Sequence, residues 1–335
     1  MLNPELKLNP KIFDEDVEQK PIRDGYGEAL LELGEKNYNV VVLTADLAES
    51  TRVYKFAEKW PERFIECGVA EQNMAGIAAG LAVSGKIPFI SSYATFSPGK
   101  NWETIRTTII YNEANVKIAG HHSGIVTGPD GATHQATEDI AIMRCLPNIK
   151  VISPCDVLEA KRATLYSAEV YGPVYIRFVR DKTPVITTEE TPFKFGKIEY
   201  FWIPWINTDS ALPSVVAIFA TGHLVYQALL AAKELEEEGI DTYVLDVHTI
   251  KPLDVETILE VANKVKGIVT VEDHQITGGL GSAIAEVLAK TKPTRMEFIG
   301  LQDTFGESGN IQDLLKKYKM DKEAIKESVK KILEL

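Results

Sequence analysis

Residues 39–46, NVVVLTAD, and residues 87–94, IPFISSYA, lie on either side of the small-residue stretch AEQNMAGIAAGLAVSG at 70–85. The two outer runs are short, apolar and rich in β-branched residues, which is typical of strands that are buried on both faces. The middle stretch has helical spacing. A strand, a helix and a second strand in this order predict parallel strands joined by a crossover helix.

The same alternation continues along the chain in two blocks. The first block has further expected strands at 116–122, 150–154 and 173–179, and further helices at 24–36, 101–112 and 156–169. The second has expected strands at 214–222, 241–252 and 266–274, and helices at 223–239 and 279–290. A length of 335 residues also favours two domains. The predicted fold class is α/β, with two domains that are each a mostly parallel sheet flanked by helices.

The stretch from 183 to 213 is rich in Thr and Pro and lacks a helical period, which indicates a domain boundary. The predicted division is an N-terminal extension at 1–19, a first domain at 20–190, a linker at 191–213 and a second domain at 214–335. Trp202 and Trp205 lie in this linker. An aromatic pair in such a place is expected to anchor onto a neighbouring surface rather than to bind a ligand.

Composition excludes several classes of protein. The net charge is −12 with no block of Lys and Arg, so the electrostatic footprint of a nucleic-acid binder is missing. No run approaches the ~18 apolar residues of a membrane span, and the N-terminus has neither signal-peptide nor transit-peptide character. Cys67, Cys145 and Cys155 lack CxxC spacing, which argues against a disulfide framework or a zinc site. We therefore expect a cytoplasmic protein with no membrane or nucleic-acid partner.

Polar and glycine-rich clusters follow the expected strands of the first block. They are TADLAEST (44–51), GVAEQ (68–72), YATF (93–96), GHHSGIVTGPDGATHQ (120–135) and RFVRD (177–181). In an open parallel sheet, ligands bind at the carboxyl ends of the strands. The five clusters therefore predict one shared site.

Residue types within these clusters suggest chemistry, with structural alternatives. Glu71 opens a helix, where a carboxylate gains ~0.3–1 kcal/mol, although acids are common in first turns anyway. The 120–135 segment holds His121, His122 and His134, three of the six histidines, which suit proton transfer or anion binding. Zinc is a weaker alternative, because no HExxH or Cys/His spacing is present.

Two further motifs leave alternatives open. Arg177 and Arg180 are three apart on an expected strand, so they point to opposite faces, and one of them could clamp a phosphate or carboxylate. A surface ion pair is the structural alternative for either arginine. The segment GGLGSAIAEVL at 278–288 matches a dinucleotide fingerprint incompletely, and we expect it to cap and pack a helix.

Three motifs together carry a family resemblance: GVAEQNMAG (68–76), SSYATF (91–96) and GPDGATHQ (128–135). In combination they resemble the pyrimidine-binding domain of transketolase. The resemblance continues through VEDHQITGGLGSAIAEVLAK (271–290) and FGESG (305–309), as in the C-terminal domain of that family. It covers residues 20–335, and the combination is more specific than any single motif.

The resemblance implies a thiamine-diphosphate site. The glutamate matching Glu71 would hydrogen-bond N1′ of the aminopyrimidine and favour the imino tautomer that removes the thiazolium C2 proton. Phe96 would pack on the pyrimidine ring, and Asp46 would belong to the cofactor pocket. Trp102 matches a further ring-packing position, beside a departure from the family pattern at Gly99.

The resemblance also implies substrate contacts. Asp130 would bind a sugar hydroxyl of the donor ketose, and His134 would contact its carbonyl or C1 hydroxyl. The phosphate of the sugar would be gripped by Arg23, Ser50, His122 and Arg180. This carry-over favours Arg180 over Arg177 as the functional arginine, and it assigns the catalytic roles to Glu71, Asp130 and His134.

The family's diphosphate-binding signature, GDG followed by a downstream Asn, is absent from this sequence. The resemblance therefore implies that an N-terminal transketolase subunit supplies the diphosphate-binding domain and Mg²⁺, in an α₂β₂ assembly, with no metal on this chain. Alone, the chain is expected to be inactive. The expected reaction moves a two-carbon ketol unit from a ketose phosphate to an aldose phosphate, as in the pentose phosphate pathway.

Three alternatives stay open. The β subunit of a 2-oxo-acid dehydrogenase E1 component has the same length and domains, but a 2-oxo acid needs no phosphate clamp. Deoxyxylulose-phosphate synthase has similar motifs but carries its diphosphate domain in one chain. A non-catalytic scaffold subunit of the same fold is the third alternative, against which the intact Glu71, His134 and arginine set argue.

Overall fold

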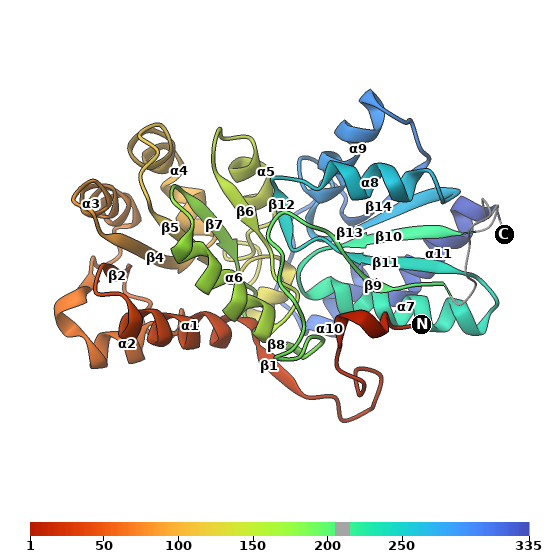
Figure 1. Ribbon diagram of the computed structural model, residues 1–335, viewed down its shortest axis with the longest axis horizontal. Helices are drawn as coiled ribbons and strands as arrows, with labels where there is room; N and C mark the ends of the chain where they lie inside the picture. Colours follow the sequence, from red (N-terminus) through yellow and green to blue (C-terminus); the bar gives the residue numbers. More distant parts are fainter. Residues whose placement is uncertain (205–214, 335) are drawn as a thin grey trace.

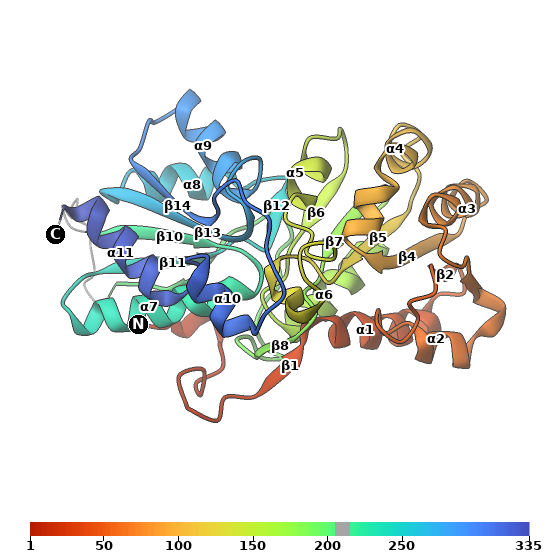
Figure 2. The same cartoon turned by 180° about the vertical axis from the view of Figure 1, so that it is seen from behind.

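The computed structural model describes residues 1–204 and 215–334, which form two α/β units that lie side by side (Figures 1 and 2). Mostly parallel sheets flanked by helices are found in both units, so the predicted fold class is confirmed. Within the described residues, no helix combines the length and the apolar character needed to cross a membrane.

The first unit is built on a sheet with the strand order β12-β6-β7-β5-β4-β2-β3. Its strands are β2 (Val40–Thr44), β3 (Phe64–Glu66), β4 (Ile87–Tyr93), β5 (Lys117–His121), β6 (Lys150–Ile152), β7 (Val174–Arg177) and β12 (Thr249–Lys251). All neighbouring pairs are parallel except β12 with β6. Its helices are α1 (Ile22–Lys36), α2 (Tyr54–Lys59), α3 (Glu71–Val83), α4 (Trp102–Thr104), α5 (Asp139–Arg144) and α6 (Val157–Glu169).

The second unit has the strand order β14-β13-β10-β11-β9. Its strands are β9 (Glu199–Trp202), β10 (Val216–Ala220), β11 (Thr242–Asp246), β13 (Gly267–Gln275) and β14 (Met296–Leu301). Its helices are α7 (Val225–Glu237), α8 (Val255–Ala262), α9 (Leu280–Lys290), α10 (Ile311–Lys317) and α11 (Lys322–Leu333). A separate ribbon pairs β1 (Gln19–Pro21) with β8 (Lys182–Pro184).

The expected strand at 241–252 is divided between the two sheets. Its first part, β11, lies in the second sheet, whereas its last part, β12, pairs antiparallel with β6 at the edge of the first. A single period-2 pattern gives no sign of this change of partner, because both halves are buried and β-branched. The second unit thus contributes a strand to the first sheet.

The stretch assigned to a linker contains β9, which pairs antiparallel with β11 of the second sheet. Trp202 is buried at its end and meets Phe13 edge to face, with ring centroids 5.9 Å apart. This contact fits the expected anchoring role for Trp202, while Trp205 lies outside the described residues. The division of the chain at 191–213 stays a prediction.

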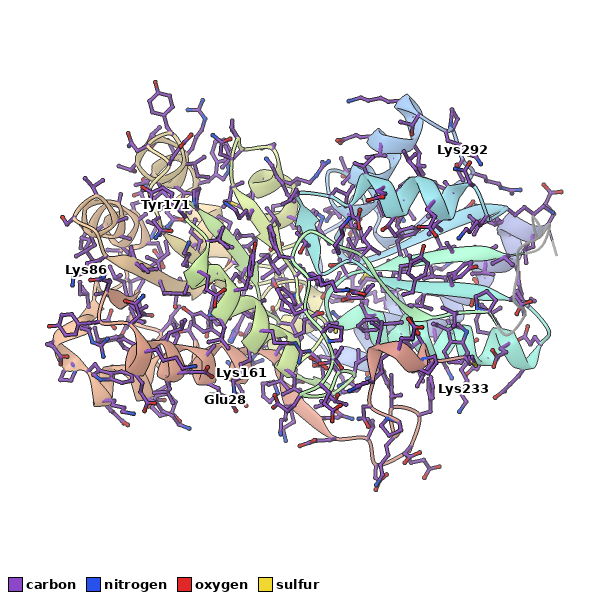
Figure 3. The ribbon with its side chains drawn as sticks, viewed as in Figure 1. Glu28, Lys86, Lys161, Tyr171, Lys233 and Lys292 are labelled. Carbon is purple, nitrogen blue, oxygen red and sulfur yellow. The ribbon has the colours of Figure 1, made fainter. Side chains whose placement is uncertain are left out.

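Glycine allows α1 and α6 to pack closely on the first sheet. A Cβ atom added to Gly25 would lie 2.0 Å from the backbone oxygen of Val157, so a larger residue would force the helices apart. The ion pair between Glu28 of α1 and Lys161 of α6 spans 3.8 Å near the surface (Figure 3). Such exposed pairs contribute little, so close packing holds these helices together.

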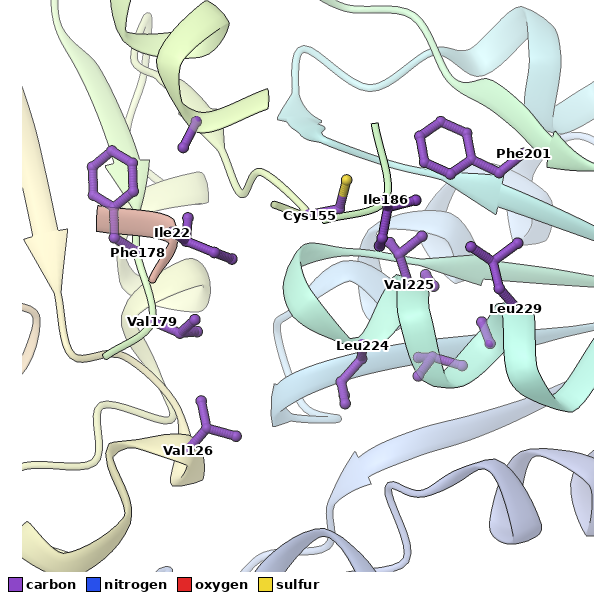
Figure 4. Close-up of a cluster of buried hydrophobic side chains, with 14 of the residues drawn as sticks. Ile22, Val126, Cys155, Phe178, Val179, Ile186, Phe201, Leu224, Val225 and Leu229 are labelled. Atoms are coloured by element: carbon purple, nitrogen blue, oxygen red, sulfur yellow. The ribbon is translucent and has the colours of Figure 1, made fainter. Parts of the chain in front are cut away.

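One hydrophobic cluster joins the two units. Figure 4 shows side chains of the first unit, including Ile22, Phe178 and Val179, in the same buried cluster as Leu224 and Val225 of the second. A continuous apolar core across a boundary resists relative motion of the two parts, because opening it would expose that surface to water.

Beside this core lies a group of buried acids. The side chains of Cys155, Glu159 and Asp246 approach within 4.8 Å of one another, and Asp246 is fully buried at the end of β11. The carboxyl of Asp246 lies beside that of Glu159, with which it can share a proton. Burial, and next the charge of Glu159, raise the pKa of Asp246 well above its ordinary value.

This environment predicts a pH-dependent stability. A carboxyl whose pKa is raised by folding binds more protons in the native state, so the free energy of unfolding falls as pH rises above 3.8, its ordinary pKa. Asp246→Asn should remove this loss and raise the melting temperature at pH 8, by about 2 °C for each kcal/mol recovered. Thermal unfolding at pH 5 and pH 8 tests this. A lower melting temperature for the variant at pH 8 would contradict this prediction.

Candidate active site

Glu71 is the first residue of α3 and is only 2% exposed. Its carboxylate Oε2 lies 3.0 Å from the ammonium Nζ of Lys100. Its backbone oxygen accepts a hydrogen bond of 3.0 Å from the side-chain amide of Asn101. The segment that follows β4 therefore fixes both the backbone and the charge of this helix start. A buried carboxylate is stable only when its charge is compensated, and Lys100 provides that compensation.

An aromatic cluster forms beside the carboxyl ends of β4 and β5. Tyr93 stacks on His122 with ring centroids 4.0 Å apart, and on Phe96 at 6.0 Å. His134 meets the ring of Phe96 edge to face at 5.5 Å. Two segments that are distant in sequence, 93–96 and 120–135, thus present flat side chains to one another. Tyr93 lies in the YATF cluster, but the sequence alone gave it no role.

A basic cluster adjoins these rings. The guanidinium Nη1 of Arg23 lies 2.7 Å from Nε2 of His122 and donates to the backbone oxygen of Ser50, also at 2.7 Å. Burial, followed by the charges of Arg23, Arg180 and Arg52, lowers the pKa of His122 to about 3. His122 is therefore neutral at physiological pH, so the possibility that a protonated histidine binds an anion does not apply to it. The positive charge here comes from the arginines.

The remaining predicted substrate residues are Asp130 and His134 in the loop after β5, and Arg180 just after β7. Arg180 donates to the backbone oxygen of Thr127 at 3.1 Å and lies 3.5 Å from Oδ1 of Asp130. Nδ1 of His134 lies 2.9 Å from the hydroxyl of Thr133. Arg180 acts electrostatically on Arg23, so the two guanidinium groups share one region. Ser50, one of the four residues predicted to grip phosphate, contacts this cluster through its backbone oxygen, which accepts the hydrogen bond from Arg23.

Arg177 and His121 are structural. Arg177 is the last residue of β7, is buried and forms an ion pair of 2.9 Å with Asp139, whereas Arg180 lies beyond the end of that strand. His121 is fully buried and stacks on Phe178 with ring centroids 4.9 Å apart. A histidine in an apolar core is expected to be neutral, and burial lowers the pKa of His121 well below its ordinary value.

Asp46 and Trp102 lie apart from the aromatic cluster. The backbone N–H of Asp46 donates to Oε1 of Glu66 at 2.8 Å, and Asp46 itself is exposed. The indole N–H of Trp102 donates to the backbone oxygen of Ile142 at 2.8 Å, and its ring packs against the apolar core under α3. No ring contact joins either residue to Phe96 in the described part of the chain, so their cofactor roles stay predictions.

Two of the predicted site residues have strained backbones. Asp46 has φ = 60° and His122 has φ = 53°, in the left-handed region that residues other than glycine rarely adopt. Such strain is kept where the surrounding structure imposes it, and it is frequent at functional sites. His122 directly follows β5 and Asp46 lies two residues beyond the end of β2, so the strain lies at the carboxyl ends of these two strands.

Comparison with known proteins identifies the family. A model described as transketolase, pyrimidine binding domain, matches residues 18–185, and one described as transketolase, C-terminal domain, matches residues 210–325. The chain belongs to the transketolase family. A transketolase C-terminal section of Methanocaldococcus jannaschii is 47% identical, with 94% of this chain and 96% of the relative covered.

Two further similar transketolase-family proteins extend this result. A 6-deoxy-6-sulfo-D-fructose transketolase subunit of a Clostridium species is 39% identical, and 91% of each chain is covered. A solved structure titled as a split gene transketolase, inactive β4 tetramer, is 42% identical with a TM-score of 0.85; 94% of this chain and 99% of that chain are covered. The similarity therefore runs through both units.

The packing of Trp102 leads to a prediction. Trp102→Phe removes the hydrogen bond to Ile142 and part of the apolar contact, so it should lower the free energy of unfolding by about 1–2 kcal/mol. It should leave thiamine-diphosphate affinity unchanged in the complete enzyme. Thermal unfolding and a cofactor titration measure the two effects. If the variant binds the cofactor more weakly at an unchanged melting temperature, Trp102 belongs to the cofactor pocket.

Proposed function

We propose that this chain is the subunit of a thiamine-diphosphate-dependent transketolase that holds the aminopyrimidine ring of the cofactor and the sugar substrate. The observation that carries the proposal is the position of the buried Glu71 carboxylate. It lies at the same sheet edge as the aromatic cluster around Phe96 and the Arg23–His122 pair. Relatives that match nearly end to end, and whose names describe a section or a subunit of transketolase, support it.

The residues at this edge fit the ring of the cofactor. Lys100 contacts Oε2 of Glu71, which leaves Oε1 as the acceptor for a protonated ring nitrogen. Phe96 offers a flat apolar surface on which a heteroaromatic ring would pack. When bound, thiamine diphosphate supplies the nucleophilic carbon that breaks the carbon–carbon bond of the ketose. The part of Glu71 is to orient the ring and hold the proton at that nitrogen.

The sugar is held by the neighbouring groups. Arg23 and Arg180 present guanidinium groups, which suit the paired oxygens of a terminal phosphate. Asp130 would accept a hydrogen bond from a sugar hydroxyl, and His134 would contact the carbonyl or the C1 hydroxyl. A terminal anion of this kind favours a sugar-phosphate substrate over the 2-oxo acid of an E1 component. A complete set of such groups also argues against a scaffold that has lost its chemistry.

The partner would cover the exposed side of α3. Val69, Val83 and Tyr111 are large hydrophobic residues that are 71%, 79% and 86% exposed, and they lie on or beside α3 and the helical segment that packs against it. Cβ atoms added to Gly76 and Gly80 of α3 would meet nothing within 4 Å. An N-terminal transketolase subunit that binds here would bring the diphosphate and Mg²⁺ of the cofactor, in an α₂β₂ assembly. We propose a cytoplasmic location for this enzyme.

Glu71→Gln tests the role of the carboxylate. In the complex with the partner subunit, cofactor and Mg²⁺, the variant should lower kcat by about 10²–10⁴-fold, because an amide cannot hold the proton at the ring nitrogen. Two-carbon transfer between a ketose phosphate and an aldose phosphate is the assay. Glu256→Gln, on the exposed surface of α8, is the matched control and should keep full activity. Undiminished kcat for Glu71→Gln would refute the assignment.

Arg180→Ala tests the anion site. Loss of a charged hydrogen-bonding group should raise KM for a phosphorylated ketose by about 10–100-fold, and leave KM for its unphosphorylated analogue within about twofold. Arg295→Ala, an exposed arginine of the second unit, is the control for a change in surface charge. Equal changes for both ketoses would reject the clamp. A smaller KM for a sulfonated ketose in the unaltered enzyme would instead assign the site to sulfonate.

A further inference from the structure

The loop that carries Asp130 and His134 is held by a carboxylate of the second unit. Asp273 lies on β13 and is 2% exposed. Its Oδ1 accepts a hydrogen bond of 2.9 Å from the backbone N–H of Ile125, and its Oδ2 accepts one of 3.4 Å from that of Val126. These two consecutive amides stand at the start of the loop, so their direction sets the path of the chain that follows.

The approach of this carboxylate depends on glycine. A Cβ atom added to Gly124 would lie 2.0 Å from Oδ2 of Asp273, and Gly124 has φ = 73°. Both the space and the backbone conformation therefore exclude a side chain at this position. The sequence around the loop is thus matched to a residue that lies 149 positions further along the chain in the other unit (273 − 124).

The surrounding charges keep Asp273 ionised. Burial opposes ionisation, but the hydrogen bond from His223 at 3.1 Å, the charges of His223 and Arg177, and the bond from Ile125 outweigh it and lower the pKa of Asp273. Arg177 also donates to the backbone oxygen of Asp273 at 2.6 Å. A charged acceptor makes stronger hydrogen bonds to backbone amides than a neutral one does.

Other parts of the second unit support the same loop. The side-chain amide of Gln135 donates to the backbone oxygens of Ile125 and Glu307, at 3.1 and 2.9 Å. A Cβ atom on Gly131 would lie 2.5 Å from the hydroxyl of Ser308. The loop therefore rests on the FGESG segment at 305–309 along one side, while its other side faces the basic and aromatic clusters.

We propose that Asp273 is a positioning residue through which the second unit sets the shape of the sugar-binding loop without touching the sugar. The proposal rests on the function proposed above. It gives the C-terminal domain a part in substrate binding, distinct from the cofactor-binding part of Glu71, which lies on α3 in the first unit.

Asp273→Asn keeps the size of the side chain but removes its charge and one of its two acceptor oxygens. In the complete enzyme, we expect KM for the donor ketose phosphate to rise by about tenfold, with kcat changed less. The affinity for thiamine diphosphate with Mg²⁺, measured by quenching of intrinsic fluorescence, should stay within about twofold. Unchanged KM, or an equal loss of cofactor affinity, would overturn the proposal.

Glu272→Gln is the matched control. Glu272 is the neighbouring buried residue on β13, and it also accepts two backbone N–H bonds, from Leu280 at 2.7 Å and Gly281 at 2.9 Å. These bonds hold the start of α9 inside the second unit, so this variant should lower the melting temperature without raising KM. A similar rise of KM in both variants would mean that general destabilisation, rather than the loop, is responsible.

Hydrogen exchange separates failure of this proposal from failure of the proposed function. The amides of Ile125 and Val126 should exchange faster in Asp273→Asn than in Glu272→Gln, whether or not any ketose is turned over. Gly124→Ala should have the same effect, because it pushes the loop away from the same carboxylate. This variant replaces Asp273→Asn in the test if Asp273→Asn does not fold. If exchange at both amides is unaltered in these variants, the positioning role of Asp273 is refuted, even when the enzyme is active. If exchange is faster but the unaltered enzyme has no transketolase activity, the proposed function is refuted and the positioning role of Asp273 is retained.

Discussion

The common direction of the strands in the first sheet is the constraint on which the site depends. Because β2, β4, β5 and β7 run parallel, the segments that follow them all emerge at one edge. Tyr93, His122 and Arg180 come from three different segments and meet there without any local sequence relation. Backbone hydrogen bonds between the strands therefore fix the spacing of side chains that must act on one ligand.

The sequence predicted the parts of the fold that depend on local pattern. Buried parallel strands give continuous apolar runs, so 39–46 and 87–94 were recognisable as β2 and β4. Arg177 and Arg180 do have different partners, Asp139 and Asp130, but Arg180 lies beyond the end of β7, so strand alternation does not account for the difference. Strands β9 and β12 owe their positions to partners that are distant in the chain, and a local pattern does not specify which edge a strand will join.

The site was predictable by residue type but not by environment. The order of the motifs identified Glu71, Phe96 and the histidine-rich loop. It did not identify Lys100 and Asp273, because their local sequence does not show that they contact the Glu71 carboxylate and the backbone amide of Ile125. Burial is likewise invisible in the sequence. A histidine such as His122 suggests a proton carrier, but desolvation and nearby arginines keep it uncharged, which makes it a rigid neutral surface beside Tyr93.

The crossover of β12 into the first sheet limits how modular this protein can be. A strand of one unit forms the edge of the other's sheet, next to β6. Removal of the second unit would uncover the backbone amides and carbonyls of β6, and bare strand edges invite pairing with other chains. If one half were exchanged between relatives, β12 of one protein would have to pair with β6 of the other. Substitutions in the two halves are therefore constrained by each other at this strand pair.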